Sequence, residues 1–164
     1  MDTIFEKARF NMLQQQIRPW DVIDDRVLRA MSEIPRENFV PDAYQGLAYA
    51  DIEVPIGASG QSMLAPKVVG RMLQALNIQS NDSILEIGTG TGYVTACLAR
   101  LGARVVSVEI DPELSEQAQD NLQSRDLRRL DVHTGDAFPE RVEGHPFDVI
   151  AVTGSMPNDE ALTG

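Results

Sequence analysis

Three glycines alternate with threonines in the stretch ILEIGTGTGYV, residues 84–94. Gly88, Gly90 and Gly92 lack the Cβ atom that would hold a ligand away from the backbone, and they follow an apolar run typical of a buried strand. In an open parallel sheet, ligands bind beyond the carboxyl ends of the strands, where the first strand-to-helix turn exposes N–H groups. The pattern therefore predicts a ligand-binding loop. The alternative is a glycine-rich turn that only packs a helix on a strand.

A carboxylate follows this loop at a spacing that suits a nucleoside ligand. Glu109 ends the next apolar run, about twenty residues beyond the loop, where a carboxylate can accept hydrogen bonds from both hydroxyl groups of a ribose. Ile110 directly follows it. We therefore assign both residues to a binding site for a ligand that carries a ribose.

The loop also distinguishes between two ligands of that kind. A dinucleotide site has the spacing G-x-G-x-x-G, whereas here Tyr93 stands at the place of the last glycine. Glu86 precedes the loop, where a carboxylate would repel a pyrophosphate but attract the ammonium or sulfonium group of S-adenosylmethionine, directly or through water. We therefore predict S-adenosylmethionine as the cofactor, with Glu86 and Tyr93 in its site. A dinucleotide oxidoreductase would also need a substrate domain, for which the chain is too short.

Two further strand ends supply candidate residues. The stretch GDAF, residues 135–138, ends the third predicted strand, where Asp136 can accept a hydrogen bond from the adenine amino group, with Ala137 beside it. Thr153 ends the fourth predicted strand, next to the glycine loop, and is expected to border the reactive methyl group. Asp148 begins that strand at the opposite end, so we assign it a structural role.

Strands and helices alternate regularly in the part of the chain that contains these residues. Pro66 suits the first turn of a helix that ends near Asn77. Strands that are apolar on both faces and alternate with helices predict an α/β fold with a parallel sheet and right-handed crossovers. The expected strands are residues 83–88, 103–110, 130–138 and 147–155, and the expected helices between them are residues 93–102 and 111–125.

The first part of the chain lacks this alternation. Apolar residues at helical spacing predict one helix within residues 4–13 and a second within residues 24–34. Residues 35–61 contain three prolines and three glycines, which favour loops and short extended pieces. We therefore expect one structural domain, in which residues 1–65 form a helical and loop cap and residues 66–164 form the cofactor-binding core.

Composition excludes several classes of partner. The formal net charge of −11 would be repelled by the phosphates of a nucleic acid, and no apolar run reaches the roughly 18 residues that span a membrane. No secretory signal is visible, and Cys97 is the only cysteine, so we expect a cytoplasmic protein without an internal disulfide. His133 and His145 have no partners at metal-ligand spacing, so no metal site is predicted.

Four segments together resemble one known family. They are MSEIPRENFVP, IGASGQSMLAP, LEIGTGTGYVTACLA and GHPFDVIAVTGS, residues 31–41, 56–66, 85–99 and 144–155. With them the chain resembles the protein L-isoaspartate O-methyltransferases, especially the bacterial members. The resemblance implies a Rossmann-like methyltransferase sheet, S-adenosylmethionine as methyl donor, and isoaspartyl-containing proteins or peptides as acceptors, methylated on the side-chain carboxylate in a repair reaction. A carboxylate is already a nucleophile, so the reaction needs alignment and exclusion of water rather than a general base.

One departure from the family pattern concerns the acceptor. The family has Thr-Ile-Ser-x-Pro after Gly-Gln, and here Leu64 takes the place of that serine. Either Ser62, two residues earlier, is the catalytic hydroxyl, or the acceptor is a different and less polar molecule. The alternatives to an isoaspartyl enzyme are therefore a methyltransferase of small molecules and an inactive module that binds S-adenosylmethionine.

The second departure concerns the end of the chain. Family members continue past the fourth strand with further strands and helices, whereas this chain stops at NDEALTG. The C-terminal strands are therefore expected to be missing. This would leave the fourth strand as an exposed edge, which another chain could cover or through which the protein could self-associate.

Overall fold

The computed structural model describes residues 2–58, 60–123, 127, 129–137 and 146–154. Its centre is a four-stranded sheet in the order β5-β4-β3-β6, in which every neighbouring pair is parallel. The predicted parallel α/β sheet is thereby confirmed, and so is the place of the fourth strand beside the strand that leads into the glycine loop. The four strands are β3 (Ser83–Ile87), β4 (Arg104–Glu109), β5 (Leu130–Thr134) and β6 (Val149–Val152).

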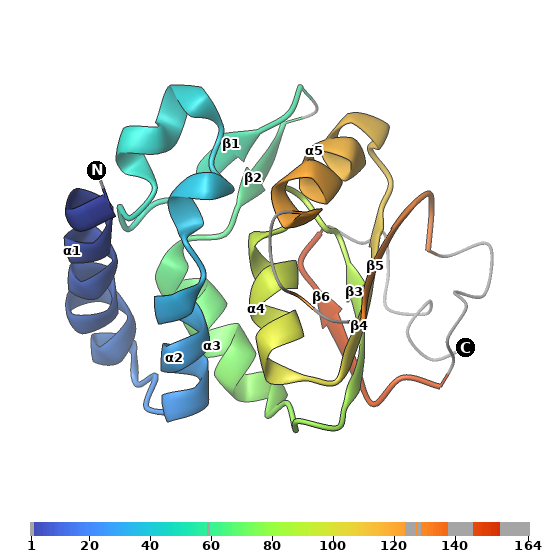
Figure 1. Cartoon of the computed structure of the whole chain (residues 1–164), viewed down its shortest axis with the longest axis horizontal. Coiled ribbons are helices and arrows are strands. Elements are labelled where there is room, and N and C mark those ends of the chain that lie inside the picture. Colours follow the sequence, from blue (N-terminus) through green and yellow to red (C-terminus); the bar gives the residue numbers. More distant parts are fainter. Residues whose placement is uncertain (1, 59, 124–126, 128, 138–145, 155–164) are drawn as a thin grey trace.

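Two helices connect the strands and cover one face of this sheet. Figure 1 shows α4 (Tyr93–Leu101) and α5 (Pro112–Gln123) on the same side, which is also the side of the N-terminal segment. A large core cluster includes apolar side chains from these helices and from the N-terminal segment. The opposite face has a smaller cluster around Leu85, Val106 and Val108. The central strands β3 and β4 are therefore apolar on both faces, as the sequence predicted, whereas Asp131, His133 and Thr134 of β5 are exposed.

The N-terminal segment is more regular than predicted. The expected first two helices are present as α1 (Asp2–Met12) and α2 (Asp25–Glu33). The first is longer than predicted, because a π-helical turn (Leu13–Ile17) and a 3-10 turn (Arg18–Trp20) continue it. Two further 3-10 turns, Arg36–Asn38 and Asp42–Leu47, precede an antiparallel hairpin. The hairpin consists of β1 (Val54–Ile56) and β2 (Gln61–Met63). The loop and extended pieces predicted for residues 35–61 are thus partly helical.

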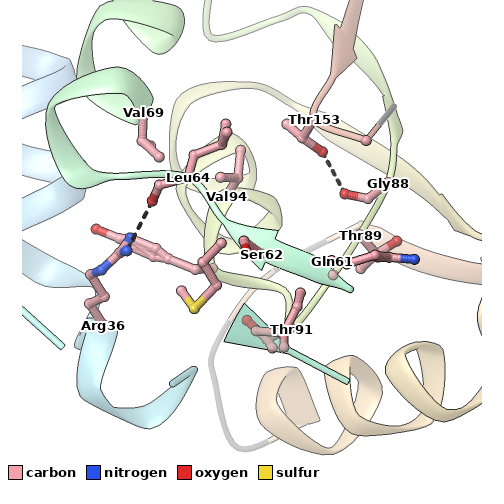
Figure 2. Close-up of a pocket in the computed structure, with 15 residues that line it drawn as sticks. Arg36, Gln61, Ser62, Leu64, Val69, Gly88, Thr89, Thr91, Val94 and Thr153 are labelled. Carbon is pink, nitrogen blue, oxygen red and sulfur yellow. Dashed lines mark hydrogen bonds between the residues drawn. The ribbon is translucent and has the colours of Figure 1, made fainter. Parts of the chain in front are cut away.

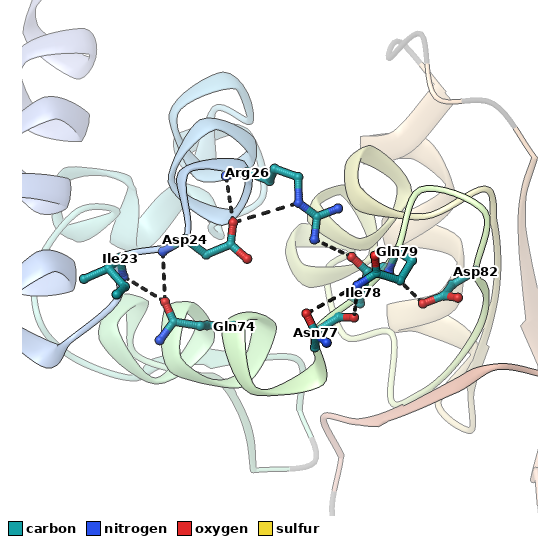
Figure 3. A network of polar contacts seen from close by, with 8 residues as sticks. All are labelled: Ile23, Asp24, Arg26, Gln74, Asn77, Ile78, Gln79 and Asp82. Carbon is teal, nitrogen blue, oxygen red and sulfur yellow. Dashed lines mark hydrogen bonds and ion pairs between the residues drawn. The ribbon is translucent and has the colours of Figure 1, made fainter.

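Helix α3 (Pro66–Leu76) joins the hairpin to the sheet and is held to the N-terminal segment by side-chain hydrogen bonds (Figure 3). The Gln74 side-chain oxygen accepts from the backbone N–H groups of Ile23 and Asp24 at 2.7 and 3.0 Å. An Nη atom of Arg26 donates to the Ile78 carbonyl at 2.6 Å, just after α3 ends at Asn77. These contacts fix the start of α2 against α3, so the cap and the sheet share one core.

Cys97 lies at the centre of α4 with no exposed surface. Burial raises the pKa of its thiol to about 12, so the group stays protonated and behaves as a small apolar side chain.

Among the described residues, no helix has both the length and the apolar character that crossing a membrane would require.

Candidate active site

Two adjacent hollows lie at the carboxyl ends of the central strands. The larger, which we call the outer cleft, has a volume of about 1250 Å³ and lies between the hairpin, the glycine loop and the ends of β4, β5 and β6. The smaller, which we call the inner cavity, encloses about 480 Å³ including its mouth, and Figure 2 shows it between the hairpin, α3 and the glycine loop. The two share Gln61, Ser62, Gly88, Thr153 and Gly154 as walls. The outer cleft is large enough for a small-molecule ligand, and the inner cavity is much narrower.

Most of the site residues predicted from the sequence line these hollows. Glu109, Ile110, Asp136 and Ala137 line the outer cleft. Ser62, Gly88 and Thr153 line both hollows, and Gly90 and Tyr93 line the inner cavity. Glu86 and Gly92 line neither. The structure therefore brings together residues from five separate segments of the chain, four of them at the carboxyl ends of parallel strands, as expected for a site there, and the fifth on the hairpin.

The three glycines of the loop have different structural reasons to lack a side chain. All three have positive φ angles, of 99°, 57° and 95° for Gly88, Gly90 and Gly92. A Cβ atom on Gly88 would lie 2.5 Å from the backbone nitrogen of Gly154, so the loop and the end of β6 touch backbone to backbone. A Cβ atom on Gly92 would lie 3.2 Å from Leu122 on α5. Gly92 thus serves helix packing, the alternative left open by the sequence, whereas Gly88 forms the wall of both hollows.

Glu109 is the carboxylate that organises the loop. Only 1% of its surface is exposed, and its two oxygens accept from the backbone N–H groups of Gly90 at 2.8 Å and Asp111 at 3.0 Å. A carboxylate has about four lone-pair positions, so these two bonds leave acceptor capacity toward the outer cleft. Its role in binding a ribose stays a prediction.

Glu86 lies beneath the loop rather than in either hollow. It is completely buried, and its carboxylate accepts from the hydroxyl groups of Thr95 and Ser107, at 2.7 Å for Ser107, while the Thr153 hydroxyl lies 3.4 Å away. Burial raises its pKa to about 7, although these hydrogen bonds oppose the shift. Thr153 lines both hollows, so its hydroxyl group lies between the Glu86 carboxylate and the candidate site.

The raised pKa makes protein stability depend on pH through Glu86. An acid whose pKa is higher in the folded state stabilises the fold fully below its unfolded pKa, here about 4.5, and the contribution is lost as the pH rises through about 7. Glu86→Gln, which cannot ionise, should remove this dependence. We expect the free energy of unfolding to fall between pH 4.5 and 8 by roughly 3 kcal/mol more in the wild type than in the variant. Denaturant titrations over that pH range measure the difference.

The exposed carboxylate Glu113 offers the control for this experiment. Glu113→Gln removes the same chemical group from the surface of α5 and should keep the wild-type pH dependence. Parallel curves for the wild type and Glu86→Gln would contradict the assignment of this titration to Glu86.

Asp148 and Thr153 occupy opposite ends of β6. Asp148 accepts from the backbone N–H of Ser83 at 2.8 Å and so ties the starts of β6 and β3 together, which agrees with the structural role predicted for it. The Thr153 hydroxyl donates to the carbonyl of Gly88 at the other end. Thr153 therefore connects the glycine loop, β6 and both hollows, whereas Asp148 is remote from the site.

The sequence did not point to several residues of the inner cavity. Arg36, Thr89 and Thr91 line it, together with Leu64 and apolar side chains of α3 and α4. Arg36 belongs to the segment MSEIPRENFVP, residues 31–41, which contributes to the family resemblance. The Tyr93 ring packs edge-on against Phe39 and lies under the Arg36 guanidinium at 4.9 Å, so it connects the inner cavity with the cap.

Histidine and metal chemistry are not evident in the described part of the chain. No group of three or more His, Cys, Asp or Glu side chains there is placed to hold a metal ion. His133 lies exposed on β5, and His145 lies outside the described residues.

The sequence matches the family model described as protein-L-isoaspartate(D-aspartate) O-methyltransferase over residues 7–161. A protein-L-isoaspartate O-methyltransferase of Methanoculleus marisnigri is 42% identical over 151 residues, which are 92% of this chain and 68% of that protein. One of Aeropyrum pernix is 42% identical over 157 residues, or 93% of this chain and 60% of that protein. The chain thus spans about two thirds of the length of these relatives.

Solved structures agree with the sequence comparison. One protein-L-isoaspartate O-methyltransferase structure has a TM-score of 0.75 at 29% identity and is matched over 90% of this chain and 47% of its own. A Plasmodium falciparum structure in complex with S-adenosyl-L-homocysteine has the same TM-score at 20% identity, over 96% of this chain and 77% of its own, and shows the shared fold. The predictions of the family and of a Rossmann-like methyltransferase fold are confirmed, and S-adenosylmethionine, predicted from the loop, is the methyl donor of this family. The chain belongs to the protein-L-isoaspartate(D-aspartate) O-methyltransferase family.

Proposed function

We propose that this chain transfers a methyl group from S-adenosylmethionine to the side-chain carboxylate of isoaspartyl residues in damaged proteins or peptides. The observation that carries the proposal is the wall shared by the outer cleft, which has Glu109 at the end of β4, and the inner cavity: Gly88 and Thr153 line both hollows. Gly88 and Gly154 in that wall have no side chains, so a cofactor can lie against their backbone. In the proposed arrangement, the nucleoside occupies the outer cleft and the reactive end reaches the shared walls.

The chain's own residues contribute position rather than acid or base chemistry. When bound, the cofactor supplies an electrophilic methyl group: the acceptor oxygen bonds to it while the sulfur takes the electron pair of the breaking bond. Glu109 holds the loop, Thr153 holds the Gly88 carbonyl, and the hairpin with Ser62 covers the meeting point of the two hollows. These groups align the reactants and exclude water, which is sufficient for a carboxylate nucleophile.

A pair of peptides tests the acceptor. A peptide with one isoaspartate should accept radiolabelled methyl groups, and the same peptide with normal aspartate should not. Equal labelling of the two peptides, or labelling of neither, would contradict the proposal. Tight binding of S-adenosylhomocysteine without labelling of any acceptor would instead identify an inactive binding module.

Methylation of a small molecule is the second candidate function. Leu64 lines the inner cavity, together with apolar side chains of the hairpin, α3 and α4. These are Ile56, Met63, Val69 and Val94. Apolar walls fit a less polar acceptor, and formation of S-adenosylhomocysteine with a panel of small acceptors, but not with the isoaspartyl peptide, would favour this candidate.

Ser62 is the proposed catalytic hydroxyl. It is exposed on β2 and lines both hollows, so its hydroxyl group is free to donate to an acceptor carboxylate. Ser62→Ala should lower kcat/KM for the isoaspartyl peptide by about tenfold to a hundredfold, the scale of a lost hydrogen bond to a charged group. Ser32→Ala is the control, since the Ser32 hydroxyl bonds only within α2. Steady-state kinetics in which both variants match the wild type would remove Ser62 from the reaction.

Self-association and location remain predictions from the sequence. In the described sheet β6 is an edge strand and Ile150 on it is 39% exposed, which supports the predicted contact between copies through this edge. Light scattering over a range of protein concentrations tests it. We keep the expectations of a cytoplasmic location and of no nucleic-acid partner.

A further inference from the structure

The inner cavity contains a buried positive charge that is not neutralised by any described carboxylate. Arg36 is 1% exposed, and its guanidinium donates to two backbone carbonyls, from Nε to Ala48 at 2.8 Å and from an Nη atom to Leu64 at 3.0 Å. Figure 2 shows the second of these bonds at the edge of the cavity. A guanidinium has five N–H groups, so these two bonds leave donors unused. Burial without a counter-ion lowers the pKa of Arg36, and such a charge is costly in free energy unless something compensates it.

Arg9 shows how the same chain satisfies another arginine. Its guanidinium pairs with the Glu37 carboxylate at 3.1 Å and donates to the Tyr49 hydroxyl at 2.8 Å and to the Ser32 carbonyl at 3.1 Å. Arg9 lines neither hollow. Of these two arginines, the one that borders the cavity is therefore the one that lacks an acidic partner among the described residues.

Two hydroxyl groups of the same cavity are also unsatisfied. The Oγ1 atom of Thr91 and the Oη atom of Tyr93 are buried and have no hydrogen-bond partner among the described residues, and each residue is 2% exposed. Buried hydroxyl groups nearly always have partners, and exceptions point to a missing ligand or to strain. Both residues line the inner cavity with Arg36. The cavity thus combines one buried cation with two unused hydroxyl groups, a donor set suited to a small anion.

We propose that the inner cavity is a carboxylate subsite in which the Arg36 guanidinium supplies the positive charge and the Thr91 and Tyr93 hydroxyl groups donate hydrogen bonds. The proposal rests on the proposed function for its two sources of carboxylate, which are the acceptor side chain and the amino-acid part of the cofactor. Arg36 and Thr91 then bind the carboxylate and take no part in bond making. The charge of Arg36 also favours an acidic acceptor over the neutral small molecule that the apolar walls would admit.

Binding measurements with matched ligands test the subsite. S-adenosylhomocysteine carries the amino-acid carboxylate, and methylthioadenosine has the same nucleoside without it. An isoaspartyl peptide carries the acceptor carboxylate, and its carboxamide twin lacks the charge. Calorimetry measures the affinity of the first pair on the free protein and of the second pair on protein saturated with S-adenosylhomocysteine. Arg36→Met should lower the affinity for the carboxylate-carrying member of one pair by about tenfold or more. The affinity for the member without the carboxylate should change by less than about twofold. The affected pair identifies the source.

Further variants separate this role from a structural one. Arg36→Lys keeps the charge and should restore part of the lost affinity, and Thr91→Val, which keeps the shape, should weaken the same ligand alone. Arg9→Met removes an ion-paired guanidinium from the cap and should lower thermal stability without distinguishing the members of either pair. If Arg36→Met does not fold, Arg36→Lys and Thr91→Val decide the question.

If the substitution lowered the affinity for both members of each pair equally, or changed neither, the proposal would be overturned. Arg36 would then have only a structural role, through its hydrogen bonds to the Ala48 and Leu64 carbonyls. The measurements do not depend on turnover. A wild type that methylates no isoaspartyl peptide would therefore contradict the proposed function, while a selective loss of S-adenosylhomocysteine binding in Arg36→Met would still support the subsite.

Discussion

Gly88→Ala is expected to weaken S-adenosylhomocysteine binding by about a hundredfold or more, which corresponds to about 2.7 kcal/mol. The new Cβ atom would lie 2.5 Å from the nitrogen and 2.7 Å from the Cα of Gly154, and both are backbone atoms that cannot turn away. The φ angle of 99° adds strain for any residue with a side chain. The loop or the end of β6 must therefore move, and both form walls of the two hollows. Isothermal calorimetry measures the affinity, and thermal unfolding measures the accompanying loss of stability.

Gly57→Ala is the matched control for this change. Gly57 also has a positive φ angle, of 64°, but it lines neither hollow, and a Cβ atom on it would meet only the Leu114 side chain, at 3.3 Å. It should therefore show the cost of backbone strain without a backbone collision, and its affinity should stay near that of the wild type. Equal affinities for Gly88→Ala and the wild type would mean that the loop is not the cofactor cradle.

Glu109→Gln is expected to weaken S-adenosylhomocysteine binding by about tenfold to a hundredfold. The glutamine side chain has nearly the same shape, but its amide nitrogen would face either the Gly90 or the Asp111 N–H group, both of which now donate to the carboxylate. One buried donor would lose its partner, and the proposed bond to the ribose hydroxyls would lose its charge. Calorimetric titration of both proteins with the same ligand provides the comparison.

The exposed Glu113 again serves as the control, because it lies four residues beyond Glu109 but lines neither hollow. Glu113→Gln should bind as tightly as the wild type. If Glu109→Gln bound as tightly as well, the nucleoside would have to be held elsewhere in the outer cleft.

The parallel sheet could be predicted from the sequence because its signals are local. Each strand is a short apolar run bounded by turn residues, and Pro66 and Asn77 mark the ends of a helix, with Asn77 in the left-handed conformation at φ 48°. The hairpin was not predicted as such, since β1 and β2 have only three residues each and their pairing depends on tertiary packing. Short strands of this kind have too little periodicity to be distinguished from loops.

The site shows the same division between local and distant signals. Glu109 and the glycine loop were found because their spacing follows from the strand-loop-helix unit. Arg36 was missed because its significance comes from burial and from carbonyl groups 12 and 28 residues away in the chain. Likewise, a carboxylate at the end of a buried strand can face the ligand or the interior, and sequence spacing does not show that Glu86 is completely buried among hydroxyl groups.

Because Cys97 is buried, the reactivity of its thiol reports when α4 becomes exposed. The chain has a single thiol, so any covalent labelling by an alkylating reagent occurs at one known place in the middle of α4. A protonated and inaccessible sulfur does not react in the native fold. Labelling must wait until α4 separates from its neighbours, and its rate then tracks the population of molecules in which that helix is exposed. The effect of every substitution on the integrity of the fold can therefore be followed by mass spectrometry on untagged protein, independently of any ligand.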